Sequence, residues 1–315
     1  MRLIHLTDPH LSTLTGVKLS SLLGKRLSGY LSWRQNRRNL YLPAVLARLV
    51  AAVRAENADQ ILLTGDLVHI GLETEITQAA EWLAALDSPD KVMLVPGNHD
   101  IYAAGSAGLV FQSWSEYLFQ SVPPAAPAGV TDQYPVVRRL GKINLIGLTT
   151  ACVTPVFMAS GKLGREQLKR LARLLQQAAR EGQMVALLIH HPPLPGMTHW
   201  RRALTDAAAL EAVLKPHPPA MIFYGHLHHN HEQQWGNTRI YCTAAASSSS
   251  DASYRVIDIE DRDDHWSVRM ALKTLDVEHA GEPGIVTLDE QSWELEKVPV
   301  RAIGGVLPKS PPATG

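Results

Sequence analysis

The feature that most constrains this chain is a repeated pairing of a short apolar run with a polar cluster directly after it. Six runs of strand length occur before residue 225, and helical patterns separate most of them: 2–7, 60–64, 91–95, 143–149, 184–189 and 220–224. Strands that alternate with helices are typical of parallel sheets. Because polar residues follow five of these runs, we expect them to meet at the carboxyl edge, where open α/β sheets bind ligands.

The segments between these runs have the spacing of helices. A proline suited to a first helical turn precedes apolar residues at helical spacing from Pro43 onward, and further helices are predicted over 73–86, 165–181 and 206–214. After residue 237 the pattern changes to three consecutive strands, expected over 238–243, 254–259 and 266–272. This order predicts an α/β fold layered as a sandwich with two sheets.

The composition excludes several classes of protein. The chain has 315 residues and a formal net charge of zero, which argues against a general nucleic-acid binder. Two cysteines are too few for a disulfide scaffold or a cysteine-rich zinc module. No apolar run approaches the ~20 residues that cross a bilayer, and the first ten residues lack the apolar core of a signal peptide. We therefore expect a cytoplasmic protein, with peripheral attachment to the inner membrane face as the alternative.

The zero net charge hides a basic segment near the N-terminus. Residues 9–55 contain eight bases and no acid, whereas residues 56–315 contain 21 bases and 29 acids. Within this segment, residues 17–38 carry leucines at helical spacing with bases beside them. We expect an amphipathic insertion over 11–42 that docks on the domain, binds an anionic membrane surface or covers the site as a lid.

The polar clusters contain carboxylate, amide and imidazole groups and no thiol. Such ligands suit divalent Mn, Fe, Co, Ni or Zn. The inventory is large enough for two ions with one carboxylate between them, and Asp66, alone after a glycine, is the expected bridge. Strand alternation turns only one of His190 and His191 toward the site. The clusters are 8–10, 65–66, 97–100, 190–191 and 225–228.

The ordered series D-x-H, G-D, G-N-H-D, H and G-H-x-H resembles the calcineurin-like metallophosphoesterase superfamily over about residues 1–275. The sequence HHPP after a strand is most similar to the bacterial branch of class III cyclic-nucleotide and glycerophospho-diesterases. The resemblance implies a four-layer αββα sandwich, two mixed sheets flanked by helices, with a binuclear metal site.

The resemblance also assigns the site residues. One ion would be held by Asp8, His10, Asp66 and His228, and the other by Asp66, Asn98, His190 and His226. His99 corresponds to a histidine that contacts the phosphate and protonates the leaving oxygen. Asp100 and His191 are expected behind the ligands, with Asp100 orienting an imidazole.

These assignments predict a phosphoesterase that cleaves a phosphodiester through a hydroxide held between two ions. The expected substrate is similar to a cyclic nucleotide or a glycerophosphodiester. The alternative is a lipid-linked pyrophosphate or nucleotide-sugar lipid at the membrane surface, which would give residues 17–38 a purpose. A metal-binding scaffold without turnover is the alternative from another class, and the acidic body disfavours a DNA nuclease.

The domain organisation follows from the extent of the resemblance. Residues 1–275 are expected to form the metallophosphoesterase domain, including the insertion at 11–42. Residues 276–315 are expected to form a C-terminal extension, with a mobile tail from about residue 299 because that part is rich in glycine and proline.

Overall fold

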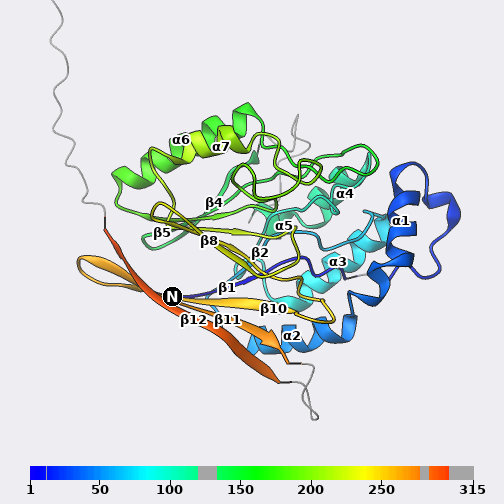
Figure 1. Cartoon of the computed structure of the whole chain (residues 1–315), viewed down its shortest axis with the longest axis horizontal. Coiled ribbons are helices and arrows are strands. Elements are labelled where there is room, and N and C mark those ends of the chain that lie inside the picture. The colour runs from blue at the N-terminus through cyan, green and yellow to red at the C-terminus, as the bar shows by residue number, and fades with distance from the viewer. Residues whose placement is uncertain (12, 120–132, 277–283, 298–315) are drawn as a thin grey trace, which may run out of the picture.

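The computed structural model describes residues 1–11, 13–119, 133–276 and 284–297, and it contains two six-stranded sheets (Figure 1). Sheet one has the order β12 (Ile285–Glu296), β11 (His265–Leu275), β10 (Ser253–Asp261), β1 (Arg2–Leu6), β2 (Gln60–Leu63) and β3 (Val92–Leu94). Sheet two has the order β4 (Val136–Leu140), β5 (Ile143–Gly147), β6 (Met184–Leu188), β7 (Met221–Tyr224), β9 (Thr238–Cys242) and β8 (His231–Trp235). Strands β1 to β3 are parallel, as are β5, β6, β7 and β9, and antiparallel strands extend both sheets.

Helices cover the outer faces of the two sheets, so the predicted four-layer sandwich is confirmed (Figure 1). Helices α6 and α7 pack on sheet two, and α2 and α3 pack on sheet one. None of the described helices has the length and hydropathy that a membrane crossing needs. The helices are α1 (Lys25–Gln35), α2 (Pro43–Ala55), α3 (Glu73–Leu86), α4 (Ser106–Ser113), α5 (Ser115–Phe119), α6 (Arg165–Arg180) and α7 (Ala207–Leu214), with 3-10 turns at Leu19–Ser21 and Arg37–Asn39.

Strand β6 shows how the layers are held together. Met184, Ala186 and Leu188 lie in the core between the sheets, whereas Val185 and Leu187 lie in the core beneath α6 and α7. Successive residues of a strand point to opposite faces, so an unbroken apolar run fits a strand that is buried on both sides. This explains why the apolar runs predict the central strands.

The predicted strands and helices agree with the structure to within about three residues, and Gly182 follows α6 with a φ of 63°. The sequence does not predict α4, α5, β4, β8 or β12. His231 begins β8, in a part of the chain where the sequence pattern predicts no strand. Strand β12 pairs with β11, so sheet one continues past the predicted boundary at residue 275. The tail from residue 299 lies outside the described residues.

The segment 17–38 is not the continuous helix that its leucine spacing suggests. Gly24, with a φ of 63°, separates the turn at Leu19–Ser21 from α1. Trp33 packs inward against Ile70 and Tyr102, whereas Leu19 and Leu23 are each 79% exposed. The predicted leucine face is therefore wrong: a cluster around an aromatic residue docks the segment, and most of its leucines face outward.

Candidate metal centre

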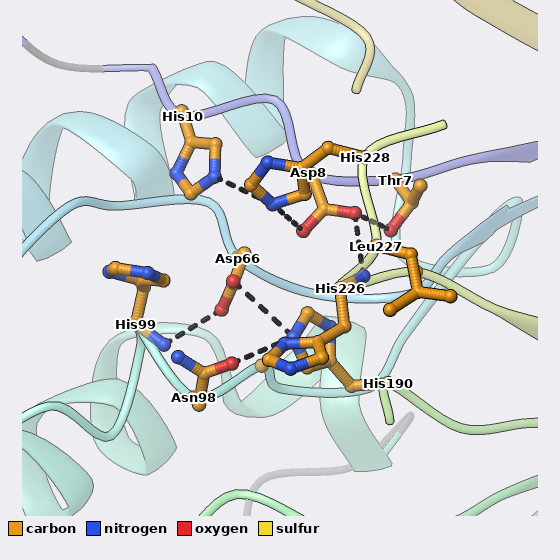
Figure 2. Close-up of polar contacts among 12 residues, drawn as sticks. Thr7, Asp8, His10, Asp66, Asn98, His99, His190, His226, Leu227 and His228 are labelled. Atoms are coloured by element: carbon orange, nitrogen blue, oxygen red, sulfur yellow. Dashed lines mark hydrogen bonds and ion pairs between the residues drawn. The ribbon is translucent and has the colours of Figure 1, made fainter. Parts of the chain in front are cut away.

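Polar residues from both sheets meet at one edge of the sandwich (Figure 2). Strands β1, β2 and β3 of sheet one and β6 and β7 of sheet two all end there. Two groups of candidate ligands form, each with its donor atoms within 4.8 Å of one another. The first group is Asp8, His10, Asp66 and His228, and the second is Asp66, His190 and His226.

The backbone at this edge is held in an uncommon conformation. In the described part of the chain, seven residues other than glycine have a positive φ, between 42° and 68°. Five of them are candidate ligands: Asp8, His10, Asp66, His226 and His228. Such conformations cost free energy and persist where the surrounding structure imposes them, often at functional sites.

Two glycines allow the loops to approach the candidate carboxylates closely. A Cβ atom on Gly97 would collide with the carboxylate and the backbone nitrogen of Asp66. A Cβ atom on Gly225 would collide with Thr7 and lie 2.6 Å from Asp8 Oδ2. The glycines of the G-N-H-D and G-H-x-H motifs are thus required by close packing against the ligands.

In the first group, Asp8 is fixed through one oxygen and leaves the other free. Its Oδ2 accepts hydrogen bonds from the Thr7 hydroxyl at 2.8 Å and the His226 backbone N–H at 3.0 Å. Its Oδ1 is buried 3.1 Å from His228 Nε2 without a hydrogen bond. His10 Nδ1 lies 3.1 Å from the Val68 carbonyl oxygen, and donation to it would leave Nε2 as the ligand atom.

The second group repeats this arrangement around Asp66. Its Oδ1 accepts a hydrogen bond from the His99 backbone N–H at 2.7 Å, and its buried Oδ2 lies 3.3 Å from His190 Nε2 without a hydrogen bond. His190 Nδ1 lies 2.6 Å from the Thr64 carbonyl oxygen, and Asn98 Oδ1 lies 3.2 Å from His190 Nε2. The amide oxygen of Asn98 therefore joins the second group.

The charges of these groups suit a cation. Burial by itself would raise the pKa of Asp66, but the neighbouring imidazoles, His190 foremost, hold it well below its usual value. Burial lowers the pKa of His10 and of His226 well below the ordinary value, so both rings are neutral, as metal ligands must be. Burial by itself would lower the pKa of His190, but the nearby Asp66 carboxylate raises it to about 9. His190 therefore carries a proton that a bound cation would displace.

Three buried atoms at the centre have no hydrogen-bond partner: Asp8 Oδ1, Asp66 Oδ2 and His226 Nε2. Buried polar atoms are rarely left unsatisfied, because the loss of water costs free energy. All three belong to the residues predicted as ligands, and the donor set of oxygen and imidazole fits two divalent ions that share Asp66. The residues present therefore fit the binuclear site.

His99 belongs to neither group of ligands. Its Nδ1 lies 2.5 Å from the His69 carbonyl oxygen, and its ring stacks on Tyr102 with centroids 5.4 Å apart. Arg37 Nη1 lies 3.0 Å from His99 Nε2, and donation by the guanidinium requires a neutral ring. Burial, aided by the Arg37 charge, holds the pKa of His99 well below its ordinary value.

Asp100 supports the site in a way that the sequence does not predict. Its carboxylate accepts hydrogen bonds from the backbone N–H groups of Asp66 at 2.9 Å, Leu67 at 2.8 Å and Gly97 at 2.8 Å. Asp100 thus ties the loops after β2 and β3 together, and the predicted contact with an imidazole is replaced by these backbone contacts. Burial raises the pKa of Asp100 to about 7.

His191 lies next to the candidate ligand His226. Its ring is 4.4 Å from that of His226 between centroids, and its Nδ1 lies 2.7 Å from the Thr150 hydroxyl. Its Nε2 lies 3.1 Å from the Ala159 carbonyl oxygen. With both nitrogens engaged, His191 positions the His226 ring.

A cavity of about 470 Å³ opens beside the metal centre. The segment 11–42 supplies much of its wall, which supports the predicted position beside the site. Tyr41 from this segment places its hydroxyl 2.5 Å from His228 Nδ1. The basic composition of residues 9–55 indicates in general terms that this part of the chain binds an anion. Arg202 also lines the cavity, and no pattern in the sequence identifies it. Of the lining residues, Lys25 and Arg37 belong to the predicted basic segment, whereas the sequence does not single out Tyr41, Tyr102, Phe157 or Arg202.

Comparisons with known proteins agree with this geometry. Residues 1–230 match the calcineurin-like phosphoesterase family. A probable cyclic nucleotide phosphodiesterase of Vesicomyosocius okutanii is 28% identical over 64% of this chain and 76% of its own length. The 3′,5′-cyclic adenosine monophosphate phosphodiesterase CpdA of Haemophilus influenzae is 25% identical over 78% of this chain and 76% of its own. A dimetal phosphatase of Danio rerio shares the fold, with a TM-score of 0.58 and 13% identity over 91% of this chain and 99% of that one.

Proposed function

Because this chain belongs to the calcineurin-like phosphoesterase family, a family of metal-dependent hydrolases, we propose that it hydrolyses a phosphodiester with two divalent ions bound. The observation that carries the proposal is the pair of ligand groups that share Asp66. Bound ions would neutralise phosphate oxygens and lower the pKa of a water molecule enough to make it a nucleophile.

The side chains around the ions have separate tasks in this proposal. Asp8, His10, Asp66 and His228 hold one ion, and Asp66, Asn98, His190 and His226 hold the other. His99, outside both ligand groups, contacts the phosphate and protonates the leaving oxygen once the anionic substrate has replaced the Arg37 contact at its Nε2. Asp100 and His191 fix the loops and the ring on which these groups depend.

A diester is favoured over a monoester by the relatives, which are described as cyclic nucleotide phosphodiesterases. The cavity of about 470 Å³ can take a group on each side of the phosphate. The relatives therefore make cyclic-nucleotide-like and glycerophosphodiester-like compounds the first diesters to test.

The test is turnover of a panel of chromogenic monoesters and diesters, cyclic nucleotides and lipid pyrophosphates with Mn, Fe, Zn, Co or Ni supplied. We expect diesters to be cleaved faster than monoesters and cleavage to be lost in Asp66→Asn. Elemental analysis of the same samples should show two ions per chain. Two bound ions without turnover on any member would instead support the scaffold that binds metal without catalysis.

A second candidate, hydrolysis of a lipid-linked phosphate at an anionic membrane, is favoured by the surface beside the cavity. Leu19 and Leu23 are each 79% exposed on the segment 17–38, and Phe157, at the cavity wall, is 82% exposed. Lys25 Nζ donates to the Thr154 hydroxyl at 2.6 Å, which brings this segment next to the loop that carries Phe157. Exposed apolar side chains with bases around them suit an anionic interface. The interface in this candidate is the cytoplasmic face of the inner membrane.

Vesicle sedimentation tests this second candidate. Each base near an anionic surface contributes about 1 kcal/mol, so we expect salt-sensitive binding that weakens in Lys18→Glu with Arg34→Glu and in Leu19→Ser with Leu23→Ser. Arg173→Glu with Arg180→Glu, on exposed positions of α6, is the matched control. Equal binding of all variants, or none by the wild type, would contradict the candidate. Lys25 and Arg26 are unsuitable because both anchor α1 to the body of the protein.

A further inference from the structure

We propose that the cavity beside the metal centre binds a second phosphate, so that the preferred substrate is a P1,P2-diester of diphosphoric acid. This inference rests on the proposed hydrolysis of phosphodiesters and names the substrate class of the same site. It is carried by three cationic side chains, Lys25, Arg37 and Arg202, which line the cavity together with the ligands. Among the residues that line it, Asp66 is the one acid.

Arg37 lies on the His99 side of the cavity. Its Nη1 is 3.0 Å from His99 Nε2, while the described residues provide no contact for its other guanidinium N–H groups. A guanidinium presents five donors in a planar fork that matches two oxygens of one phosphate. Arg37 therefore has free N–H donors for a second phosphate, next to the phosphate that His99 contacts.

Arg202 lies on the opposite, His226 side. Its Nη2 donates to the His226 carbonyl oxygen at 2.8 Å, which ties the guanidinium to the loop of a candidate ligand. Both arginines act on Tyr41: burial raises the pKa of its hydroxyl to about 12, and the charges of Arg37 and Arg202 oppose this rise. The two guanidinium groups thus line the same cavity as Tyr41 and come from different parts of the chain.

Lys25 supplies the third charge. Its Nζ donates to the Thr154 hydroxyl at 2.6 Å and to the Met158 carbonyl oxygen at 3.1 Å, and it lies 4.5 Å from the centre of the Tyr102 ring. These partners are neutral, so they do not cancel its charge. Within the part of the chain that the structure describes, no carboxylate forms an ion pair with Lys25, Arg37 or Arg202.

The charge balance favours a substrate with more than one ionised phosphate. Two divalent ions would more than neutralise Asp8 and Asp66, so the centre already attracts one phosphate without any base. Three further cations would remain uncompensated in a half-enclosed cavity, where charges interact more strongly than in bulk water. A second phosphate, one bridging oxygen away from the first, supplies the matching negative charge.

The reaction balances without a co-reactant. The oxygen of one water molecule forms a bond to one phosphorus, and the bond from that phosphorus to the bridging oxygen breaks. The bridging oxygen stays with the second phosphorus, and each product is a phosphate monoester that carries one hydrogen of the water.

The kinetic test compares two diesters that differ by one phosphate, diadenosine 5′,5′-diphosphate and diadenosine 5′,5′-monophosphate. We expect the wild type to show the larger kcat/KM on the diphosphate. Arg37→Gln and Arg202→Gln should each raise KM for the diphosphate about 10- to 100-fold, the size of one hydrogen bond between charged groups, and change KM for the monophosphate diester much less. Arg37→Lys should recover part of the loss.

Matched controls come from the neighbouring arginines. Arg38 is exposed, and Arg201 lies over the Trp200 ring with 5.2 Å from its Cζ to the ring centre; neither lines the cavity. Arg38→Gln and Arg201→Gln should leave both KM values unchanged. Equal kcat/KM on the two diesters, or equal losses on both in Arg37→Gln and Arg202→Gln, would overturn the inference while leaving phosphodiester hydrolysis intact.

A binding test without turnover separates the inference from the proposed function. Calorimetry on metal-free protein in chelator should show tighter binding of methylenediphosphonate than of methylphosphonate, and Arg37→Gln should remove the difference. Equal binding of the two would count against the second phosphate site even if no diester is cleaved.

A further turnover experiment distinguishes a lipid source of the diphosphate from a soluble one. It compares cytidine diphosphate diacylglycerol in mixed micelles with diadenosine diphosphate, and cleavage of either supports the inference.

Discussion

The metal centre and the segment 11–42 lie side by side, yet they are built by opposite means. The ligands follow the ends of strands buried on both faces, and the side chains of Asp8 and Asp66 are almost completely enclosed. The segment has short helical pieces, exposed leucines and one small apolar cluster around Trp33. The comparison indicates that two parts of the protein have different tasks. The ends of the buried strands, here called the rigid edge, hold the metal centre. The segment 11–42, here called the flap, shapes the cavity and the surface around it.

The largest effect should come from the shared carboxylate at the rigid edge. Asp66→Asn removes the charge that joins the two ligand groups, so we expect metal content to fall from two ions to one or none and turnover to fall to background. Elemental analysis and turnover of a chromogenic diester check both. Two tightly held ions in this variant would show that the centre does not depend on a shared carboxylate.

The next effect concerns His99, where the rigid edge meets the flap. His99→Ala should keep both ions and lose about 10²–10⁴-fold in rate on substrates with poor leaving groups, because general acid catalysis contributes about that much. Activated aryl esters should lose less, because their leaving oxygen needs no proton. Loss of metal, or equal losses on both kinds of ester, would assign His99 to the support of the centre.

The flap itself can be tested by a matched pair of apolar substitutions. Trp33→Ala empties the cluster beneath α1 and should lower the free energy of unfolding by about 3–5 kcal/mol. Leu23→Ala changes an exposed side chain and should stay within about 0.5 kcal/mol of the wild type. Denaturant titration followed by tryptophan fluorescence gives both values. If the two substitutions cost the same, the assignment of inward and outward faces is wrong.

The smallest effect is a dependence on pH that arises in the flap. Burial lowers the pKa of Lys25 to about 8, against weaker opposing effects of Cys152 and Asp66. The amine is therefore charged below pH 8 and loses its charge above it, well before an exposed lysine would. We expect KM for an anionic substrate to rise above about pH 8 in the wild type and this rise to be absent in Lys25→Met, whose KM should be higher at lower pH. The same profile in both would assign the pH dependence to another group.

The rigid edge was accessible to sequence reasoning, and the flap was accessible only in part. Apolar runs predict β1, β2, β3, β6 and β7 because these strands are buried on both faces, and the polar clusters after them contain the candidate ligands that the structure brings together. Strand β12 is mostly exposed, with Ile285, Trp293 and Leu295 only partly buried against the core, and it carries no apolar run, so pattern alone does not identify it.

Within the flap, the spacing of the leucines predicts the wrong face. Helix α1 is docked by Trp33 and by Gly29, where a Cβ atom would strike the Tyr102 side chain, and both contacts lie across elements distant in sequence. Arg202 shows the same limit, since its place in the cavity depends on the long loop between β6 and α7. Tertiary contacts of this kind leave no local period in the sequence.

The positive φ angles of five candidate ligands set stability against function. The positive φ angles cost less free energy for glycine than for the aspartates and histidines found here, so these side chains lower stability. The residues concerned are Asp8, His10, Asp66, His226 and His228. A laboratory selection for thermal stability alone, carried out with a chelator present, should therefore replace these positions early, with glycine or asparagine. Selection for turnover should restore them, because the geometry that burdens folding is the geometry that binds the ions.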